Sequence, residues 1–310
     1  MSAVLPSSAM RVDELLARGE PVFSFEFFPP KTPEGVDALF ETVAALRPLE
    51  PDYVSVTYGA GGATRDGTVE IATRIHEEYG IEVMAHLSCV GETQEGLESI
   101  LDRFADAGIE NVLALRGDPP RGEENFEQPE GGLSSAAELT AFIRERHDYT
   151  IGGACFPEVH PEADGLDADL RYLKTKVDAG ASFLITQLFF DNHVYWGFVD
   201  AAREHGIDVP IIPGVIPITS YGQVRRICEL CDATIPADLD ASMRSLGGDA
   251  EAEALLGVAY AARQCDELLA GGAPGIHFYA LNRAPGVRAV LSALRASRPW
   301  ERARPAAAAT

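Results

Sequence analysis

The sequence is poor in lysine and tryptophan and contains no long hydrophobic run. Lys31, Lys174 and Lys176 are its only lysines, so arginine carries nearly all the positive charge. No apolar run reaches the roughly 18 residues of a membrane span, and we expect neither a transmembrane helix nor membrane binding. The N-terminus lacks the basic start and apolar block of a secretory signal. These absences predict a cytoplasmic protein.

Cysteines are few and positive charge is scarce. Five cysteines without a regular spacing favour a reducing compartment over a disulfide framework. Cys228 and Cys231 form a C-x-x-C pair, but no second pair or nearby histidine completes a zinc site, so we expect no metal. The net charge of −23 disfavours nucleic acid and anionic lipid as partners. Salt adaptation of the source and a codon bias toward arginine and alanine are the two alternative explanations of this acidic, lysine-poor composition.

Short apolar runs alternate with longer segments of helical period, a pattern typical of βαβ units on a parallel sheet. The eight predicted strands are Pro21–Pro29, Tyr53–Gly59, Glu82–Cys89, Asn111–Asp118, Thr150–Glu158, Phe183–Asp191, Val209–Pro217 and Ile276–Asn282. The predicted helices are Pro33–Leu46, Asp66–Tyr79, Thr93–Ala107, Ser134–Arg146, Asp167–Ala179, Val194–His205, Ser220–Cys231, Ala237–Ser245, Ala250–Ala270 and Pro285–Ala296.

Eight strands that are each followed by a helix predict an α/β fold, a (β/α)8 TIM barrel in one domain with extra helices before the last strand. An open doubly wound sheet is the competing architecture, but the glycine-rich nucleotide turn that it needs is missing after the first strand. We expect a peripheral extension with a helix over residues 1–20, the barrel over 21–296 and a disordered tail over 297–310, with no regulatory domain after the barrel.

Barrel enzymes place their chemistry at the C-terminal ends of the strands, and the residues found there exclude several reactions. No lysine lies at a strand end, which disfavours a Schiff-base mechanism. The histidines are spread over different elements, which disfavours a metal-dependent hydrolase. Only two tryptophans are present, and a glycosidase cleft normally needs aromatic platforms beside its two carboxylates.

Two acidic residues remain as candidates for proton chemistry. Glu26 lies in a strand with four phenylalanines, and burial there is expected to raise the pKa of its carboxyl, which suits a general acid. The alternative is a partly exposed glutamate on the other face of that strand. Asp118 follows Arg116 and Gly117 at the end of the fourth strand, where it is either functional or a turn residue before two prolines.

The strand-end segments together resemble the methylenetetrahydrofolate reductase family. They are SFEFFPPKT (24–32), VSVTYGAGG (54–62), AHLSC (85–89), LALRGDPP (113–120), FPEVHPEA (156–163), ITQLFFD (185–191), IIPGVIP (211–217) and HFYALNR (277–283). The resemblance extends from about Pro21 to Leu294, with all eight segments in order. It implies a flavin barrel in which NADH, or alternatively NADPH, reduces FAD and leaves. 5,10-Methylenetetrahydrofolate then takes the hydride in the same space and becomes 5-methyltetrahydrofolate, a methyl donor for methionine biosynthesis.

The resemblance also implies roles for individual residues. Glu26 matches the general acid, and Asp118 matches an aspartate close to both flavin and pterin. Gln187, Gln223 and Arg283 match contacts to the folate substrate. The residues that match the FAD site, where Thr57 matches a nicotinamide or flavin contact, are Thr57, Tyr58, His86, Arg116, Gly117, Asp118, Ser135, Ala136, Phe156, His160, Ala163, Asp169, Tyr172 and Lys176.

Two positions depart from the family pattern, since tyrosine is frequent there in the family and this chain has Ser135 and Phe156. The loss of a hydroxyl and of a ring is expected to weaken adenine or ribose contacts of FAD. A flavin-free reductase with direct hydride transfer and a non-catalytic folate-binding barrel are therefore the alternative functions. The family implies a homo-oligomer, a dimer or a tetramer, although no helix of the sequence shows a large apolar stripe.

Overall fold

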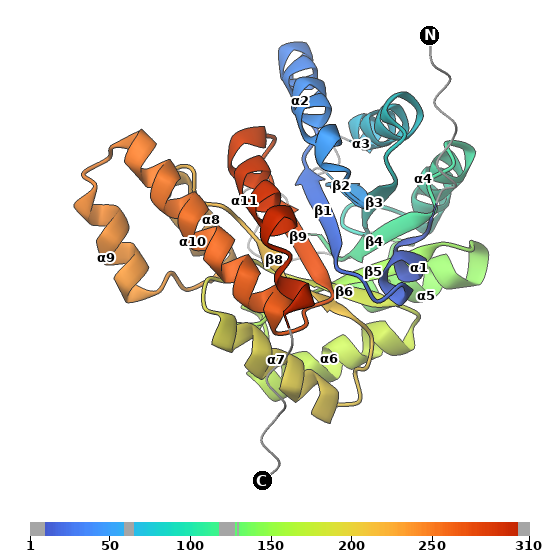
Figure 1. The fold of residues 1–310 in the computed structure, drawn as a ribbon. Coiled ribbons are helices and arrows are strands. Elements are labelled where there is room, and N and C mark those ends of the chain that lie inside the picture. The colour runs from blue at the N-terminus through green and yellow to red at the C-terminus, as the bar shows by residue number, and fades with distance from the viewer. Residues whose placement is uncertain (1–9, 59–64, 118–127, 129, 303–310) are drawn as a thin grey trace.

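The computed structural model describes residues 10–58, 65–117, 128 and 130–302, and its strands form a ring surrounded by helices (Figure 1). The nine strands pair in parallel in the order β7-β6-β5-β4-β3-β2-β1-β9-β8. They are β1 (Val22–Phe27), β2 (Tyr53–Val56), β3 (Val83–Ser88), β4 (Asn111–Leu115), β5 (Thr150–Cys155), β6 (Phe183–Thr186), β7 (Ile211–Ile212), β8 (Gly214–Val215) and β9 (Gly275–Tyr279). The predicted single-domain (β/α)8 barrel is thus confirmed.

The barrel closes through one segment that is counted as two strands. Both β7 and β8 lie within the single predicted strand Val209–Pro217, and Pro213 separates them. Ile211 pairs with β6, whereas Gly214 and Val215 pair with β9. Proline has no backbone N–H to donate, but the carbonyl of Pro213 accepts a hydrogen bond from the amide of His277 at 3.0 Å. Eight segments therefore complete the ring, as predicted.

The helices follow the strands as expected, and three of them match their predicted bounds residue for residue: α2, α9 and α10. The helical segments are α1 (Val12–Ala17), α2 (Pro33–Leu46), η1 (Arg47–Leu49), α3 (Arg65–Arg74), η3 (Ile75–Tyr79), α4 (Gln94–Asp106), α5 (Ala136–Arg146), α6 (Leu166–Asp178), α7 (Asn192–Glu204), α8 (Tyr221–Cys231), α9 (Ala237–Ser245), α10 (Ala250–Ala270), α11 (Ala284–Ser297) and η4 (Pro299–Glu301). The predicted extra helices, α8 to α10, lie together on one side of the ring (Figure 1).

Side-chain caps explain where several helices begin. Thr32, Thr93 and Ser135 each accept a hydrogen bond from a backbone N–H in the first turn of the helix that follows. Asp191 and Asp249 do the same for α7 and α10. Such caps satisfy N–H groups that have no partner within the helix, which stabilises the helix start by roughly 1 kcal/mol each.

The N-terminal helix packs against the barrel, whereas we had expected a peripheral extension there. Val12 and Leu15 of α1 are buried against the first residues of the strands, including Val22 and Tyr53. The amide of Val12 donates to Asn111 Oδ1 at 2.8 Å, and Asp13 Oδ1 accepts from the Thr150 hydroxyl at 2.9 Å. Asn111 and Thr150 open β4 and β5, so α1 closes the floor of the barrel, opposite the mouth.

Helical structure continues past residue 297, where we expected a disordered tail to begin. Helix α11 runs to Ser297, and η4 follows it at Pro299–Glu301. The ring of Trp300 lies 5.7 Å from that of Phe23 in β1. The boundary expected at residue 297 is therefore too early, because an aromatic contact ties residues up to η4 to the barrel; residues 303–310 lie outside the described ranges.

A partly buried acid on the floor of the barrel, Glu82, predicts a pH-dependent stability. Glu82 is partly exposed, and its Oε1 accepts from the side-chain amide of Asn111 at 2.8 Å. Burial and the nearby Glu110 raise the pKa of Glu82 to about 7. Because the folded-state pKa lies above the usual 4.5, Glu82 contributes stability at low pH that is lost as the pH rises through 7.

We therefore expect Glu82→Gln to be more stable than the parent at about pH 8. A pKa shift from 4.5 to about 7 corresponds to about 3 kcal/mol of unfolding free energy for a fully buried group. Because Glu82 is partly exposed, the expected gain in stability is about 1–2 kcal/mol. Thermal unfolding at about pH 8 and about pH 4 measures the gain, which should vanish at the lower pH. The matched control is Glu98→Gln, at an exposed position of α4. An equal gain at both pH values would contradict the assignment.

Candidate active site

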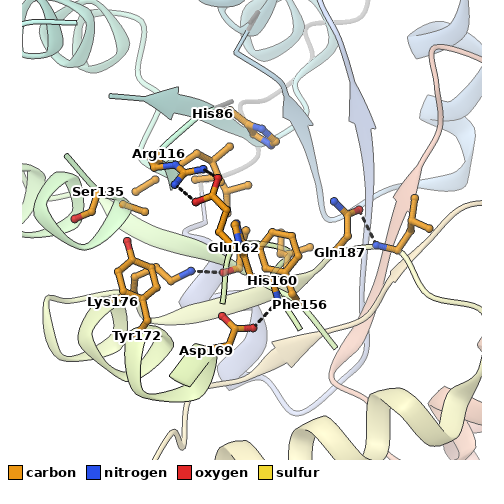
Figure 2. A pocket seen from close by; sticks show the side chains of 18 of the residues that line it. His86, Arg116, Ser135, Phe156, His160, Glu162, Asp169, Tyr172, Lys176 and Gln187 are labelled. Carbon is orange, nitrogen blue, oxygen red and sulfur yellow. Dashed lines mark hydrogen bonds and ion pairs between the residues drawn. The ribbon is translucent and has the colours of Figure 1, made fainter. Parts of the chain in front are cut away.

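A cavity of about 900 Å³ lies at the C-terminal ends of the strands, where barrel chemistry is expected. Figure 2 shows side chains from several elements around it, with His86 of β3 on one side and Tyr172 and Lys176 of α6 on the other. The predicted site residues that line the cavity are Glu26, Thr57, Tyr58, His86, Arg116, Gly117, Ser135, Ala136, Phe156, His160, Ala163, Asp169, Tyr172, Lys176 and Gln187. The structure thus brings together most of the residues that the sequence singled out.

Three predicted residues are not part of this lining. Asp118 lies outside the described residues. Gln223 is exposed in the first turn of α8, and Arg283 is exposed at the residue before α11. The assignments of Asp118, Gln223 and Arg283 stay predictions.

Glu26 lies between two histidines from distant parts of the chain. Its Oε2 is 3.3 Å from His277 Nε2 of β9 and 3.4 Å from His86 Nε2 of β3. His277 Nδ1 is 2.7 Å from the Ser24 hydroxyl. These contacts are mutually satisfied when Ser24 donates to Nδ1 and the Nε2–H of His277 donates to Glu26. The side chain of Glu26 is about 20% exposed, and it faces the cavity.

The histidines reverse the pKa shift that we expected for Glu26. Burial alone raises the pKa of the Glu26 carboxyl, but the hydrogen bond from His277 and the attraction of the imidazoles together lower it below its usual value. Burial lowers the pKa of His86 to about 4, so His86 is neutral at pH 7 and we attribute the effect on Glu26 chiefly to His277. Glu26 is therefore ionised in the ligand-free protein, and the expectation of a raised pKa is wrong.

One end of the cavity is polar and is built from the segments after β4 and β5. Arg116 forms a bidentate pair with Glu162 at 2.5 and 2.8 Å (Figure 2). The amide of His160 donates to Asp169 Oδ2 at 3.0 Å. Gly117 has a φ of 90°, and a Cβ there would lie 2.0 Å from Ser88 Oγ, so only glycine lets the chain turn directly after Arg116.

Lys176 supplies a buried amine at the same end. Its Nζ donates to the carbonyl of Ala154 at 2.5 Å and lies 5.6 Å from the centre of the Tyr172 ring. Burial lowers the pKa of Lys176. The other two lysines lie elsewhere, since Lys174 pairs with Asp178 across one turn of α6 and Lys31 is exposed in the segment after β1.

The other end of the cavity is largely apolar. Leu188, Ile216, Ile227 and Leu281 contribute to it. Tyr279 crosses from β9 and donates from its hydroxyl to the carbonyl of Thr186 at 2.7 Å. The cavity thus offers charged groups at one end and apolar surface suited to flat ring systems at the other.

The two positions that depart from the family pattern have partners within the chain. The ring of Phe156 lies edge-on to His160, with the centroids 4.5 Å apart. The Ser135 hydroxyl accepts the amide hydrogen of Glu138 at 3.2 Å as the cap of α5. Both residues line the cavity, but the Ser135 hydroxyl is already engaged by the helix.

Sequence reasoning did not assign three residues that shape the site: Glu162, His277 and Tyr279. All three lie in the segments FPEVHPEA and HFYALNR, so the signal was present. Their roles depend on contacts to Arg116, Glu26 and Thr186, and strand order alone does not give such contacts.

Potential metal ligands, cysteines and long apolar helices bear on the remaining sequence predictions, within the residues that the structure describes. There, no group of three or more His, Cys, Asp or Glu side chains is arranged to hold a metal ion. Its five cysteines are free thiols, and burial raises the pKa of both Cys228 and Cys231. None of the helices within the described ranges has both the length and the apolar character of a membrane span.

Comparison with known proteins places these features in a family. A family model described as methylenetetrahydrofolate reductase matches residues 11–295. The protein named 5,10-methylenetetrahydrofolate reductase from Escherichia coli (strain K12) is 40% identical over 86% of this chain and 88% of its own length. Methylenetetrahydrofolate reductase (NADH) 1 from Arabidopsis thaliana is 40% identical over 94% of this chain, which spans only 52% of that protein.

A solved structure supports the fold independently of close sequence similarity. It is a Clostridium thermocellum protein described as binding two copies of 5-methyl-5,6,7,8-tetrahydrofolic acid, with a TM-score of 0.60 and 16% identity over 91% of this chain and 97% of its own. At that identity the likeness establishes the barrel alone. The family model, which covers the barrel from α1 into α11, and the curated relatives show that the chain belongs to the methylenetetrahydrofolate reductase family.

Proposed function

We propose that this protein reduces 5,10-methylenetetrahydrofolate to 5-methyltetrahydrofolate with NADH as the hydride donor and FAD as the bound carrier, in a ping-pong sequence. The observation that carries the proposal is Glu26, a carboxylate within 3.4 Å of two histidines that faces the cavity at the barrel mouth. Relatives whose names specify this reduction support the substrate. The structural neighbour that binds a methylated tetrahydrofolate supports the substrate class.

The residues around the cavity fit FAD. Arg116, Lys176 and His160 gather at the polar end, where the diphosphate of a dinucleotide needs cationic and N–H donors. Leu188, Tyr279 and other apolar residues line the opposite end, which suits the flavin and pterin rings. When bound, FAD supplies a two-electron carrier that accepts hydride from the nicotinamide and delivers it to the folate.

Glu26 is the proton donor in this proposal. A general acid must be protonated, whereas Glu26 is ionised in the ligand-free protein because its pKa is lowered. Ring systems bound at the mouth exclude water from the carboxylate, which raises its pKa in the direction that the role requires. Glu26 lines the cavity and is about 20% exposed, so it takes its proton from water before the rings close over it, and that proton then passes to the folate amine as the methylene bridge opens.

The remaining substrate assignments extend this proposal. Gln187 follows β6 and lines the cavity, and its Oε1 accepts the amide hydrogen of Leu188 at 2.8 Å; in this proposal it orients the folate. Plant relatives carry NADH in their names, which supports NADH over NADPH. We also propose a cytoplasmic homo-oligomer that serves methionine biosynthesis.

An absorption spectrum of the purified protein, recorded without oxygen during titration with NADH, tests the proposal. Flavin bands that bleach with NADH and recover with methylenetetrahydrofolate are the expected result. A colourless protein that gains turnover when FAD is added has merely lost its cofactor. Turnover that needs no flavin would replace the relay by direct hydride transfer, and folate binding without NADH oxidation would leave only a binding barrel.

A further inference from the structure

The polar end of the cavity contains an ion pair, Arg116–Glu162, in which a carboxylate occupies the cation that an anionic ligand would need. Glu162 engages both terminal nitrogens of Arg116, the same donors that a diphosphate would use. The two side chains are 26% and 58% exposed, so the carboxylate lies at the solvent side of the pair. Figure 2 shows the carboxylate of Glu162 pointing toward the guanidinium of Arg116.

The charge balance of the cavity is unfavourable for an anionic ligand. Its described lining contains two basic side chains, Arg116 and Lys176, against the four carboxylates of Glu26, Glu162, Asp164 and Asp169. Asp169 is held by the amide of His160, and Glu26 is held by His277. Glu162 is therefore the carboxylate that most directly competes with incoming phosphates for a cation.

We propose that Glu162 is a displaceable counter-ion, which occupies Arg116 until the diphosphate of the cofactor replaces it. This inference rests on the proposed function, because it takes FAD as the anion. A phosphate oxyanion accepts from the same two guanidinium nitrogens as the Glu162 carboxylate, so Arg116 exchanges one anionic partner for another without losing its hydrogen bonds. Displaced Glu162 then lies beside the phosphates, and this like-charge repulsion weakens cofactor binding and slows association.

The backbone around Glu162 is fixed by contacts that do not need its carboxylate. The amide of Glu162 donates to His160 Nδ1 at 3.1 Å, and the amide of Ala163 donates to the carbonyl of His160 at 2.9 Å. A glutamine at position 162 should therefore preserve the loop and remove only the charge. Asp164 offers a matched control, since it lines the same cavity and carries the same charge.

The test is a titration of apoprotein with FAD, followed by quenching of flavin fluorescence, together with stopped-flow association rates. We expect Glu162→Gln to bind FAD roughly tenfold more tightly, mostly through faster association, and Asp164→Asn to stay within about twofold of the parent. Circular dichroism of each variant checks that the barrel is intact.

The outcomes separate this inference from the proposed function. If the parent binds FAD and Glu162→Gln binds it equally or more weakly, the counter-ion role is wrong while FAD remains the cofactor. A parent that does not bind FAD and a Glu162→Gln variant that does would also support the role. Failure of both proteins to bind FAD would overturn the inference and the cofactor assignment together. If Asp164→Asn also bound FAD tenfold more tightly, the gain would come from the loss of any negative charge in the cavity. That result would contradict a specific exchange at Arg116.

Discussion

Replacing Glu26 by glutamine is expected to lower the turnover of methylenetetrahydrofolate reduction about 10²- to 10⁴-fold, the usual contribution of a general acid. Glutamine has nearly the shape of glutamate and can still accept a hydrogen bond from His277 Nε2. It cannot deliver a proton to the folate amine, so ring opening loses its acid. Steady-state oxidation of NADH at saturating folate measures the loss.

Two comparisons make the Glu26 result specific. In the proposed flavin relay, bleaching of FAD by NADH in the absence of folate should be unchanged in Glu26→Gln, because that step needs no acid. Glu158→Gln provides the matched variant, since Glu158 accepts from the amide of Thr234 at 3.1 Å and does not line the cavity. Its turnover should stay close to that of the parent. Undiminished turnover in Glu26→Gln would mean that another group supplies the proton.

We expect that no side-chain atom can be added at Gly214 of β8, the strand that pairs with β9 to close the barrel, without destabilising the fold. A Cβ there would lie 2.4 Å from the carbonyl oxygen of Thr186 and 2.7 Å from the ring of Tyr279. The backbone and a ring held by its hydroxyl on the Thr186 carbonyl yield poorly, so Gly214→Ala should destabilise the fold by about 2–3 kcal/mol. That loss corresponds to a decrease of roughly 4–10 °C in the melting temperature of a domain of this size.

Gly222→Ala is the matched control for this steric argument. A Cβ at Gly222 meets nothing within 4 Å, and the residue lies in the first turn of α8. Helix propensity predicts a neutral to slightly stabilising effect there, up to about 1 kcal/mol. Calorimetry of both variants measures the contrast. A melting temperature of Gly214→Ala equal to that of the parent would show that the segment between β6 and β9 shifts freely.

The strands were predictable from the sequence, but their C-terminal ends were not. The expected strand Phe183–Asp191 pairs only as far as Thr186, although Leu188, Phe189 and Phe190 are all buried. The apolar pattern reports burial, and burial continues in the loop after pairing has stopped. Pro213 similarly divides the strand predicted over Val209–Pro217 without breaking the ring.

The electrostatics of the site were not predictable, because they depend on distant partners. The phenylalanines beside Glu26 are local in sequence and suggested a raised pKa. His277, which reverses that shift, is 251 residues away in the chain and becomes a neighbour only because β9 pairs with β1. The direction of the pKa shift of Glu26 is therefore set by a contact between the first and last strands of the ring. The spacing of residues along one strand does not predict such a contact.

The uneven placement of the lysines has a practical consequence for handling the protein. Lys176 is buried and Lys174 is paired with Asp178, whereas Lys31 is exposed beside the mouth in the segment between β1 and α2. Among the side-chain amines, acylating dyes and amine-coupled supports would therefore attach mainly at Lys31. Such attachment would orient the molecules with the mouth toward the support, so carboxyl-directed coupling is the better choice for binding measurements on a surface.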